Sequence, residues 1–235
     1  MSDLVIVTDR PTHVLLRLDD GKANALSFAV FEALNAGLDR AAMAGKPVVI
    51  AGRPGKFSAG FDLTVMGAGG DSMFRLLRQG ADLAIRLLSF DTPVVLAVSG
   101  HALAMGALLC LCADYRIGIA GPYKLGLNEV AIGMTLPWFA IELARSRLEE
   151  TQLSQAVGLA KIYDPEGAVG AGYLDEVVSG DDLEARVEET VVSFAGLNME
   201  AHRATKERMR EPLLERLHTA LSRDFGEGLG IADAS

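Results

Sequence analysis

The stretch VVLAVSGHALAMGALLCLCA, residues 94–113, decides how this chain folds. Its first five residues are apolar and mostly β-branched, as in a buried strand, whereas its second half is rich in Ala and Leu and favours a helix. The stretch is about long enough to cross a bilayer, but Ser99, Gly100 and His101 interrupt its middle. A buried strand that turns into a buried helix therefore explains it better than a membrane span.

Composition sets the outer bounds around this stretch. With 235 residues, half of them hydrophobic, the chain can form one sizeable core. Its net charge of −9 and the lack of a dense basic run argue against nucleic-acid binding. Cys110 and Cys112 fall on different faces of the expected helix, so we expect buried inert thiols and neither a disulfide nor a metal pair. His13, His202 and His218 are scattered without metal-ligand spacing, and no metal is expected.

Neither end of the given sequence resembles a targeting signal. Residues 1–4 lack the basic and apolar regions of a signal peptide, and residues 233–235 do not form a peroxisomal signal. Together with the free cysteines, this predicts a cytoplasmic protein without a membrane segment.

Strands and helices alternate along the chain. Residues 4–8 and 13–18 predict a hairpin, and Ser27 is expected to cap a helix with apolar residues at helical spacing. Residues 52–70 look like a long Gly-rich connection, and a helix at 71–88 should bury a stripe from Phe74 to Leu88. The remaining expected elements are strands at 47–51, 94–98 and 115–120 and helices from 104, at 133–147, 150–159, 181–194 and 200–225. This order predicts an α/β domain with both sheet faces covered.

Three apolar strands, beginning near residues 47, 93 and 115, each lead into a turn and a helix. Periodicity alone allows either a doubly wound sheet or a stack of β-β-α turns. Asp114 and Arg116, two residues apart on the third strand, should share a face and form an ion pair. His101, at the junction of a strand and a helix, is expected to pack or to form a hydrogen bond.

Three short motifs carry the chemistry. In KFSAGFDL, residues 56–63, the small residues around Gly60 let a ligand approach the backbone. In SGHALAMGALL, residues 99–109, a helix N-terminus points N–H groups at a site. In GLNEV, residues 126–130, Glu129 is flanked by apolar residues and glycines. It lies either at an exposed turn or in a buried position, where its pKa would rise toward that of a general base.

Together these motifs resemble the crotonase superfamily, whose members bind acyl-CoA thioesters and stabilise an enolate with two backbone N–H groups. The resemblance covers about residues 5–210. It implies a crotonase-type spiral of repeated β-β-α units in residues 1–195, followed by a helical C-terminal trimerisation region in residues 196–235. It also implies an acyl-CoA substrate, no further cofactor, and a homotrimer or a hexamer.

The resemblance assigns roles to individual residues. The N–H groups of Phe61 and Met105 would form the oxyanion hole, and Glu129 would be the base. Family hydratases carry a second glutamate at the position of Leu108, whereas mitochondrial-type Δ3,Δ2-enoyl-CoA isomerases carry a lone glutamate and a leucine. The resemblance therefore implies an isomerase. The residues expected to bind CoA or the substrate are Lys22, Ala23, Ala25, Ala59, Gly60, Asp62, Leu63, Gly106 and Asn128.

Two other functions and one assembly question stay open. The chain could be a 2-enoyl-CoA hydratase that uses Glu129 alone or with an unidentified helper. It could also be a silent acyl-CoA-binding protein, since Phe61 and Met105 are bulkier than usual beside the thioester. An apolar stripe at i+4 steps in the tail, from Leu213 to Phe225, must be buried either at a subunit boundary or against its own domain.

Overall fold

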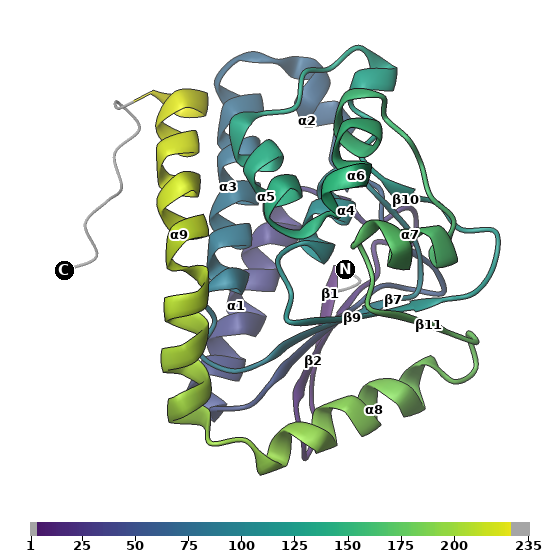
Figure 1. The fold of residues 1–235 in the computed structure, drawn as a ribbon, viewed down its shortest axis with the longest axis vertical. Helices are drawn as coiled ribbons and strands as arrows, with labels where there is room; N and C mark the ends of the chain where they lie inside the picture. Colours follow the sequence, from purple (N-terminus) through teal and green to yellow (C-terminus); the bar gives the residue numbers. More distant parts are fainter. Residues whose placement is uncertain (1–3, 227–235) are drawn as a thin grey trace.

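A six-stranded sheet forms the centre of the molecule in the computed structural model, which describes residues 4–226 (Figure 1). Its strands follow the order β1-β2-β4-β7-β9-β11; β1 and β2 are antiparallel and the other neighbours are parallel. The predicted hairpin and the three predicted apolar strands all lie in this sheet. The bounds are β1 Val5–Asp9, β2 Val14–Leu18, β4 Val48–Ala51, β7 Val94–Val98, β9 Tyr115–Ile119 and β11 Glu176–Val178.

Short strands build two smaller sheets beside the main one. A parallel sheet has the order β10-β8-β5, and β3 pairs with β6. The prediction of a long Gly-rich connection at 52–70 was wrong, because two strands and a helix lie there. Strands of two to four residues are too short to show alternation in a sequence. Their bounds are β3 Ala25–Leu26, β5 Gly55–Ser58, β6 Gly60–Phe61, β8 Gly100–Leu103 and β10 Leu125–Gly126.

Nine α-helices and three shorter turns complete the described part of the chain. Ser27 caps α1 as predicted, because its side chain accepts the N–H of Val30. The stripe predicted for α3 is shifted: Phe74 is 42% exposed and the buried face contains Leu76 instead. The helices are α1 Phe28–Ala44, α2 Leu63–Ala68, α3 Gly70–Leu88, α4 Met105–Cys110, α5 Trp138–Arg147, α6 Glu150–Leu153, α7 Pro165–Ala171, α8 Leu183–Ser193 and α9 Met199–Phe225; the turns are η1 Val130–Ile132, η2 Ser154–Gly158 and η3 Phe194–Gly196.

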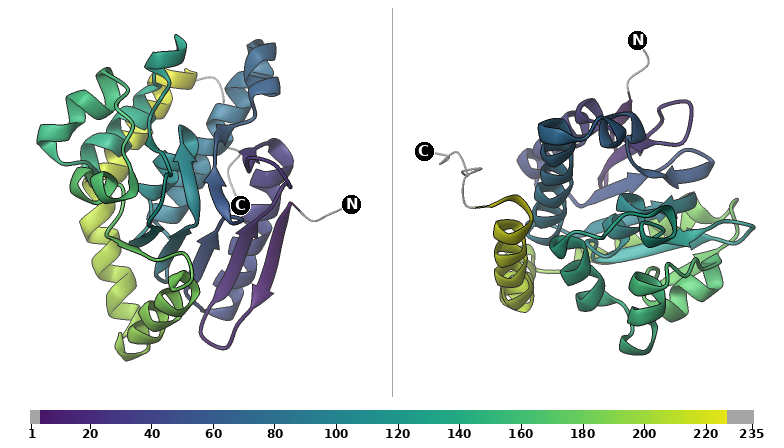
Figure 2. Two further views of the ribbon diagram at one scale, coloured as in Figure 1. Left: turned by 90° about the vertical axis from the view of Figure 1, so that its right-hand side faces the viewer. Right: turned by 90° about the horizontal axis from the view of Figure 1, so that it is seen from above.

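Both faces of the main sheet are covered, as predicted. Alternate strand residues such as Leu16, Ile50 and Leu96 belong to a large core shared with α1, α3 and α4. The residues between them pack in a second cluster, which includes Val187 and Val191 of α8. Figures 1 and 2 show α8 crossing the sheet on the side away from α1 and α3.

The stretch that opened the sequence analysis forms β7, β8 and α4, so the strand-to-helix prediction is confirmed. No helix within residues 4–226 is both long enough and apolar enough to cross a membrane. Cys110 and Cys112 are free and fully buried, and burial raises the pKa of each thiol to about 12. The prediction of inert thiols is therefore confirmed.

The tail stripe is covered by its own chain. Leu213, Leu217 and Leu221 are buried in the main core, where α9 packs along α5 and α3 (Figures 1 and 2). The structure thus shows packing against its own domain, and the stripe gives no reason for a subunit boundary. A trimerisation role for residues 196–235 remains a prediction, and residues 227–235 lie outside the described part.

The predicted Asp114–Arg116 ion pair was wrong. Asp114 precedes β9, and its carboxylate instead pairs with Lys206 of α9 at 2.6 Å and accepts the N–H of Val94. Arg116 pairs with Asp175, also at 2.6 Å. Alternation along a strand does not apply to a residue outside the strand, and distant segments bring closer partners to both charges.

Candidate active site

The three motifs meet in the small parallel sheet β10-β8-β5, because each motif supplies one of its strands. Ala102 of β8 is paired with Ser58 of β5 on one side and Leu125 of β10 on the other. The N–H of Ala104 also donates to the carbonyl of Gly126 at 3.0 Å. Since the strands are parallel, the chain leaves all three at the same edge, and such edges are frequent ligand sites.

At this edge the first two motifs are in backbone contact around Gly60. Its φ is +93°, and a Cβ at this position would lie 3.2 Å from the N atom of Met105 and 2.7 Å from the Cβ of Ala104. Helix α4 begins at Met105, so the N–H of that residue has no partner within the helix. The residues expected to carry the two oxyanion donors, Phe61 and Met105, therefore flank a contact that only glycine permits.

The side chains of Phe61 and Met105 point into the core. A Cβ at Gly80 of α3 would lie 2.6 Å from Cζ of Phe61 and 3.4 Å from Cε of Met105. The Phe61 ring lies 6.1 Å from that of Phe31, and Met105 is fully buried. Because Gly80 has no side chain, it leaves room in the core for the large side chains of Phe61 and Met105, which had been expected beside the thioester.

Glu129 begins the short turn η1, and its own carbonyl accepts the N–H groups of Ile132 and Met134. Its Oε2 atom is buried and has no hydrogen-bond partner among the described residues, and the same holds for Oδ1 of Asn128. Burial raises the pKa of the Glu129 carboxyl above its usual range. A carboxyl with a raised pKa holds a proton more readily than an exposed one, which suits a group that accepts a proton and returns it.

The position expected for a second glutamate is apolar. Leu108 of α4 is 1% exposed and belongs to the main core. Within residues 4–226, no group of three or more His, Cys, Asp or Glu side chains is arranged to hold a metal. Of positions 108 and 129, only Glu129 therefore offers a carboxyl group.

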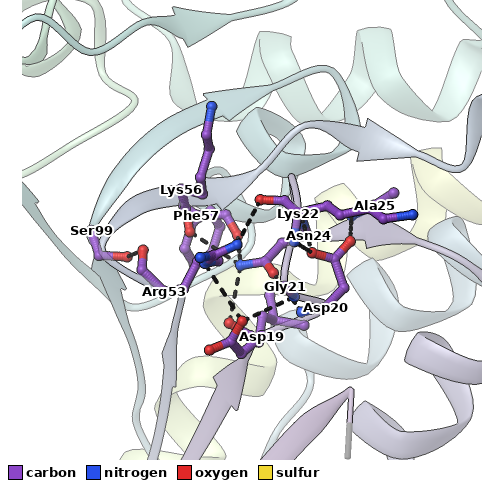
Figure 3. Close-up of polar contacts among 11 residues, drawn as sticks. Asp19, Asp20, Gly21, Lys22, Asn24, Ala25, Arg53, Lys56, Phe57 and Ser99 are labelled. Carbon is purple, nitrogen blue, oxygen red and sulfur yellow. Dashed lines mark hydrogen bonds and ion pairs between the residues drawn. The ribbon is translucent and has the colours of Figure 1, made fainter. Parts of the chain in front are cut away.

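A loop at residues 19–25 is fixed beside the first motif (Figure 3). The carboxylate of Asp20 accepts the N–H groups of Lys22 at 2.7 Å, Asn24 at 2.9 Å and Ala25 at 3.1 Å. Burial opposes ionisation of Asp20, but these three bonds together hold its pKa below the usual value. The carboxylate thus sets the shape of the loop.

Asn24 ties this loop to the first motif. Its φ is +55°, a conformation that asparagine tolerates better than most residues. Its amide nitrogen lies 3.0–3.1 Å from the carbonyls of Leu18, Lys56 and Phe57 (Figure 3). Its own carbonyl accepts the hydroxyl of Ser58 at 2.8 Å. Asn24 is not among the predicted site residues, although the Asp20-Gly21 dipeptide before it is a turn signal.

The other predicted site residues surround this assembly. Lys22 and Ala59 are exposed, and the N–H of Ala59 donates to Ala23. Asp62 caps α2, because its side chain accepts the N–H of Thr64. Leu63, the first residue of α2, is 72% exposed.

Two more predicted residues have clear packing. A Cβ at Gly106 would lie 2.5 Å from the carbonyl O of Ser58, so this glycine lets α4 approach the first motif. His101 accepts the N–H of Lys124 and packs edge-on against Tyr123, which confirms the predicted packing and hydrogen bond.

Residues 12–226 match the enoyl-CoA hydratase/isomerase family. The chain belongs to this family. A Pseudomonas syringae member shares 44% identity and superimposes with a TM-score of 0.93 over 95% of this chain and 97% of its own. Human mitochondrial Δ3-Δ2-enoyl-CoA isomerase shares 26% identity and a TM-score of 0.87 over 94% of this chain and 88% of its own. The crotonase fold expected from the sequence is confirmed.

Curated relatives carry both activities in their names. The mouse mitochondrial enoyl-CoA delta isomerase 1 is 29% identical over 70% of this chain, which spans 57% of the mouse protein. A probable enoyl-CoA hydratase of Bacillus subtilis is 32% identical over 72% of this chain, which spans 60% of that protein. Family membership is thus shown, and the choice between the two reactions depends on the site.

Proposed function

We propose that this protein is a Δ3-to-Δ2 enoyl-CoA isomerase that uses Glu129 as its only acid–base group. Two features of the site together carry the proposal. The Glu129 carboxyl is largely buried and has no hydrogen-bond partner among the described residues, and position 108 is a leucine. Moving a double bond needs one group that takes and returns a proton, whereas adding water also needs a group that activates the water.

The backbone supplies the electrostatic part of the mechanism. The thioester oxygen would accept the N–H groups of Phe61 and Met105, whose positions meet at Gly60. As the C2 proton leaves, negative charge develops on this oxygen, and removing one such donor typically lowers the rate by about 10²–10³.

Glu129 supplies the proton transfer. Its carboxylate takes a proton from C2 of a 3-enoyl thioester, which gives a dienolate delocalised over C2 to C4. The same carboxyl then returns that proton to C4, and the double bond moves from C3–C4 to C2–C3. No atom is gained or lost, so neither a water nor a second carboxyl is needed. The raised pKa helps because the protonated intermediate state of Glu129 must be accessible.

The rigid 19–25 loop supports a CoA site at the same edge. Lys22 stands exposed on it, and the guanidinium of Arg53 donates to the Lys22 carbonyl at 3.1 Å. Cations on a fixed loop suit the phosphates of CoA. The backbones of Ala23, Ala25, Ala59, Asp62 and Leu63 border this loop and the first motif, and we assign them to the rest of the CoA moiety.

The second candidate is 2-enoyl-CoA hydration, which the names of several relatives favour. The apolar side chain of Leu108 offers no hydrogen bond to hold a water. A silent acyl-CoA-binding protein is less supported, since Phe61 and Met105 are packed against Gly80.

One set of assays separates the three functions. Purified protein is given 3-enoyl-CoA esters of several chain lengths, and conjugation of the double bond is followed by absorbance; hydration of crotonyl-CoA is measured in parallel. We expect isomerisation with little hydration. Comparable turnover of both substrates would favour the hydratase, and calorimetric binding of a saturated acyl-CoA without any turnover would favour the silent protein.

We also propose a homotrimer or a dimer of trimers. Several large apolar side chains near the site are exposed, including those of Ile132 at 55% and Trp138 at 48%, and exposed apolar surface is typical of interfaces. Sedimentation at micromolar concentration is expected to show the oligomer, and a stable monomer would remove this proposal without affecting the catalytic one.

A further inference from the structure

The hydroxyl of Tyr173 is a buried hydrogen-bond donor without an acceptor among the described residues. Tyr173 lies between α7 and β11, is fully buried, and anchors its N–H on the carbonyl of Ala168 at 2.9 Å. Its OH group has no hydrogen-bond partner among the described residues. A phenylalanine would fill nearly the same volume without burying an unsatisfied hydroxyl, which is unfavourable.

The fold places this hydroxyl behind the third motif. Leu125 and Tyr163 exchange two backbone hydrogen bonds, each 2.9 Å long, and the Tyr173 ring lies 5.8 Å from the Tyr163 ring. Glu129 follows Leu125 by one short turn. The pKa of Tyr173 is raised by burial and further by the charges of Tyr163, Cys110 and Glu129. Glu129 is therefore close enough to interact electrostatically with the Tyr173 hydroxyl.

Three oxygen atoms of this region are buried without a partner: Oδ1 of Asn128, Oε2 of Glu129 and the hydroxyl of Tyr173. The amide oxygen and the ionised carboxylate can only accept hydrogen bonds, whereas the hydroxyl can donate one. Of the three, only Tyr173 can therefore stabilise the charged form of Glu129.

We propose that Tyr173 is a positioning residue, whose hydroxyl donates a hydrogen bond through one bridging water to the ionised carboxylate of Glu129. Its effect on the rate rests on the proposed function, but its effect on the proton affinity of Glu129 does not. The bond holds the carboxylate in one orientation and offsets part of the rise in pKa that burial causes.

The surrounding groups leave Glu129 as the titrating member of this set. Burial raises the pKa of Cys110 to about 12, and burial also raises the pKa of Tyr163, so both stay neutral over the working range. Among the described residues, the pKa of Glu129 is raised by burial, and a hydrogen bond from its own backbone lowers it by less.

Tyr173→Phe tests the proposal through its pH profile. Because the carboxylate must be ionised to take the proton, kcat/KM rises with pH through the pKa of Glu129. Loss of a hydrogen bond to the charged form should move this acid limb upward by about one pH unit or less. We expect kcat to fall about five- to tenfold with KM changed less than twofold. Thermal stability should be retained, because a phenylalanine ring fills nearly the same volume and buries no hydroxyl.

Tyr163→Phe is the matched control. It removes a hydroxyl from the neighbouring ring, and that hydroxyl already donates to Oε1 of Gln152 at 3.2 Å. This variant should keep the rate and the pH profile of the unmodified protein.

A second measurement does not need activity. The carboxyl carbons of glutamate are labelled with ¹³C, the signal of Glu129 is assigned by its absence in Glu129→Gln, and its pKa is read from the NMR titration without substrate. We expect a higher pKa in Tyr173→Phe and an unchanged one in Tyr163→Phe. An unchanged Glu129 pKa in Tyr173→Phe would overturn the proposal. A raised pKa in a protein that isomerises nothing would support it and would reject the proposed function alone.

Discussion

Carboxylates are partly buried in two regions of this molecule, with opposite consequences. In the first region, Asp114, just before β9, pairs with Lys206 of α9, and Asp175, in the segment after α7, pairs with Arg116 of β9. At the carboxyl edge of the small sheet, Glu129 is partly buried, and within residues 4–226 its carboxyl pairs with no cation.

The difference separates a structural carboxylate from a reactive one. Burial opposes ionisation of Asp175, but its hydrogen bonds and ion pair with Arg116 together lower its pKa. For Glu129 burial is unopposed by any cation, and its pKa rises. A carboxylate held ionised stabilises the fold, whereas one released toward neutrality can exchange a proton with a substrate.

The largest expected effect tests the reactive side of this comparison. Glu129→Gln should lower single-turnover isomerisation of a 3-enoyl-CoA by about a thousandfold or more, because the amide cannot accept the C2 proton. Thermal unfolding should show a stability equal to or above that of the unmodified protein. Nearly intact isomerisation would exclude Glu129 as the base.

The next effect tests the structural side. Asp175→Ala leaves the 4%-exposed side chain of Arg116 without its partner, and such a loss typically costs about 3 to 5 kcal/mol of unfolding free energy. The control is Glu184→Ala, which removes an exposed pair with Arg10 and should cost less than about 1 kcal/mol. Equal costs in denaturant titrations would mean that burial of the pair contributes nothing.

Both regions show which features a sequence can reveal. Glu129 was singled out because it is a carboxylate among apolar residues and glycines, but its expected role as the base came from the resemblance to the crotonase superfamily. The partners of Asp114 and Arg116 were not found, because Lys206 and Asp175 are distant in sequence and nothing local points to them. The apolar stripe of α9 was likewise predicted, but a stripe does not say which surface covers it.

The site was predictable where it depends on a backbone requirement and hidden where it depends on side-chain packing. Gly60 was expected because close approach needs glycine, whereas Gly106 was expected from the resemblance and proves to allow such an approach as well. Asp20 and Asn24 act through turn geometry that only the folded loop displays. Tyr173 looks in the sequence like any aromatic core residue, and only its unpartnered hydroxyl distinguishes it.

A smaller effect is expected when a second carboxylate is added at position 108. Leu108→Glu places an acidic group in α4, and we expect crotonyl-CoA hydration to rise about tenfold. This is below the roughly 10²–10⁴-fold that a well-positioned acid–base group contributes. Leu108→Gln is the control, since it adds polarity without a proton-transfer group. Equal hydration by the two variants would show that the carboxyl has no part in the gain.

The smallest effect is a difference in how stability depends on pH. The folded-state pKa of Glu129 is raised, so the stability linked to it is fully present below the unfolded pKa and is lost as pH rises through the folded pKa. Glu129→Gln mimics the protonated form, and its melting temperature should therefore match the unmodified protein near pH 4 and exceed it at pH 8. Asp175 has a lowered pKa, so its contribution is present above the unfolded pKa and is lost as pH falls through the folded pKa. The deficit of Asp175→Ala should accordingly shrink toward acid pH. Melting curves over this pH range measure both trends, and parallel trends for the two variants would contradict the division between a paired and an unpaired carboxylate.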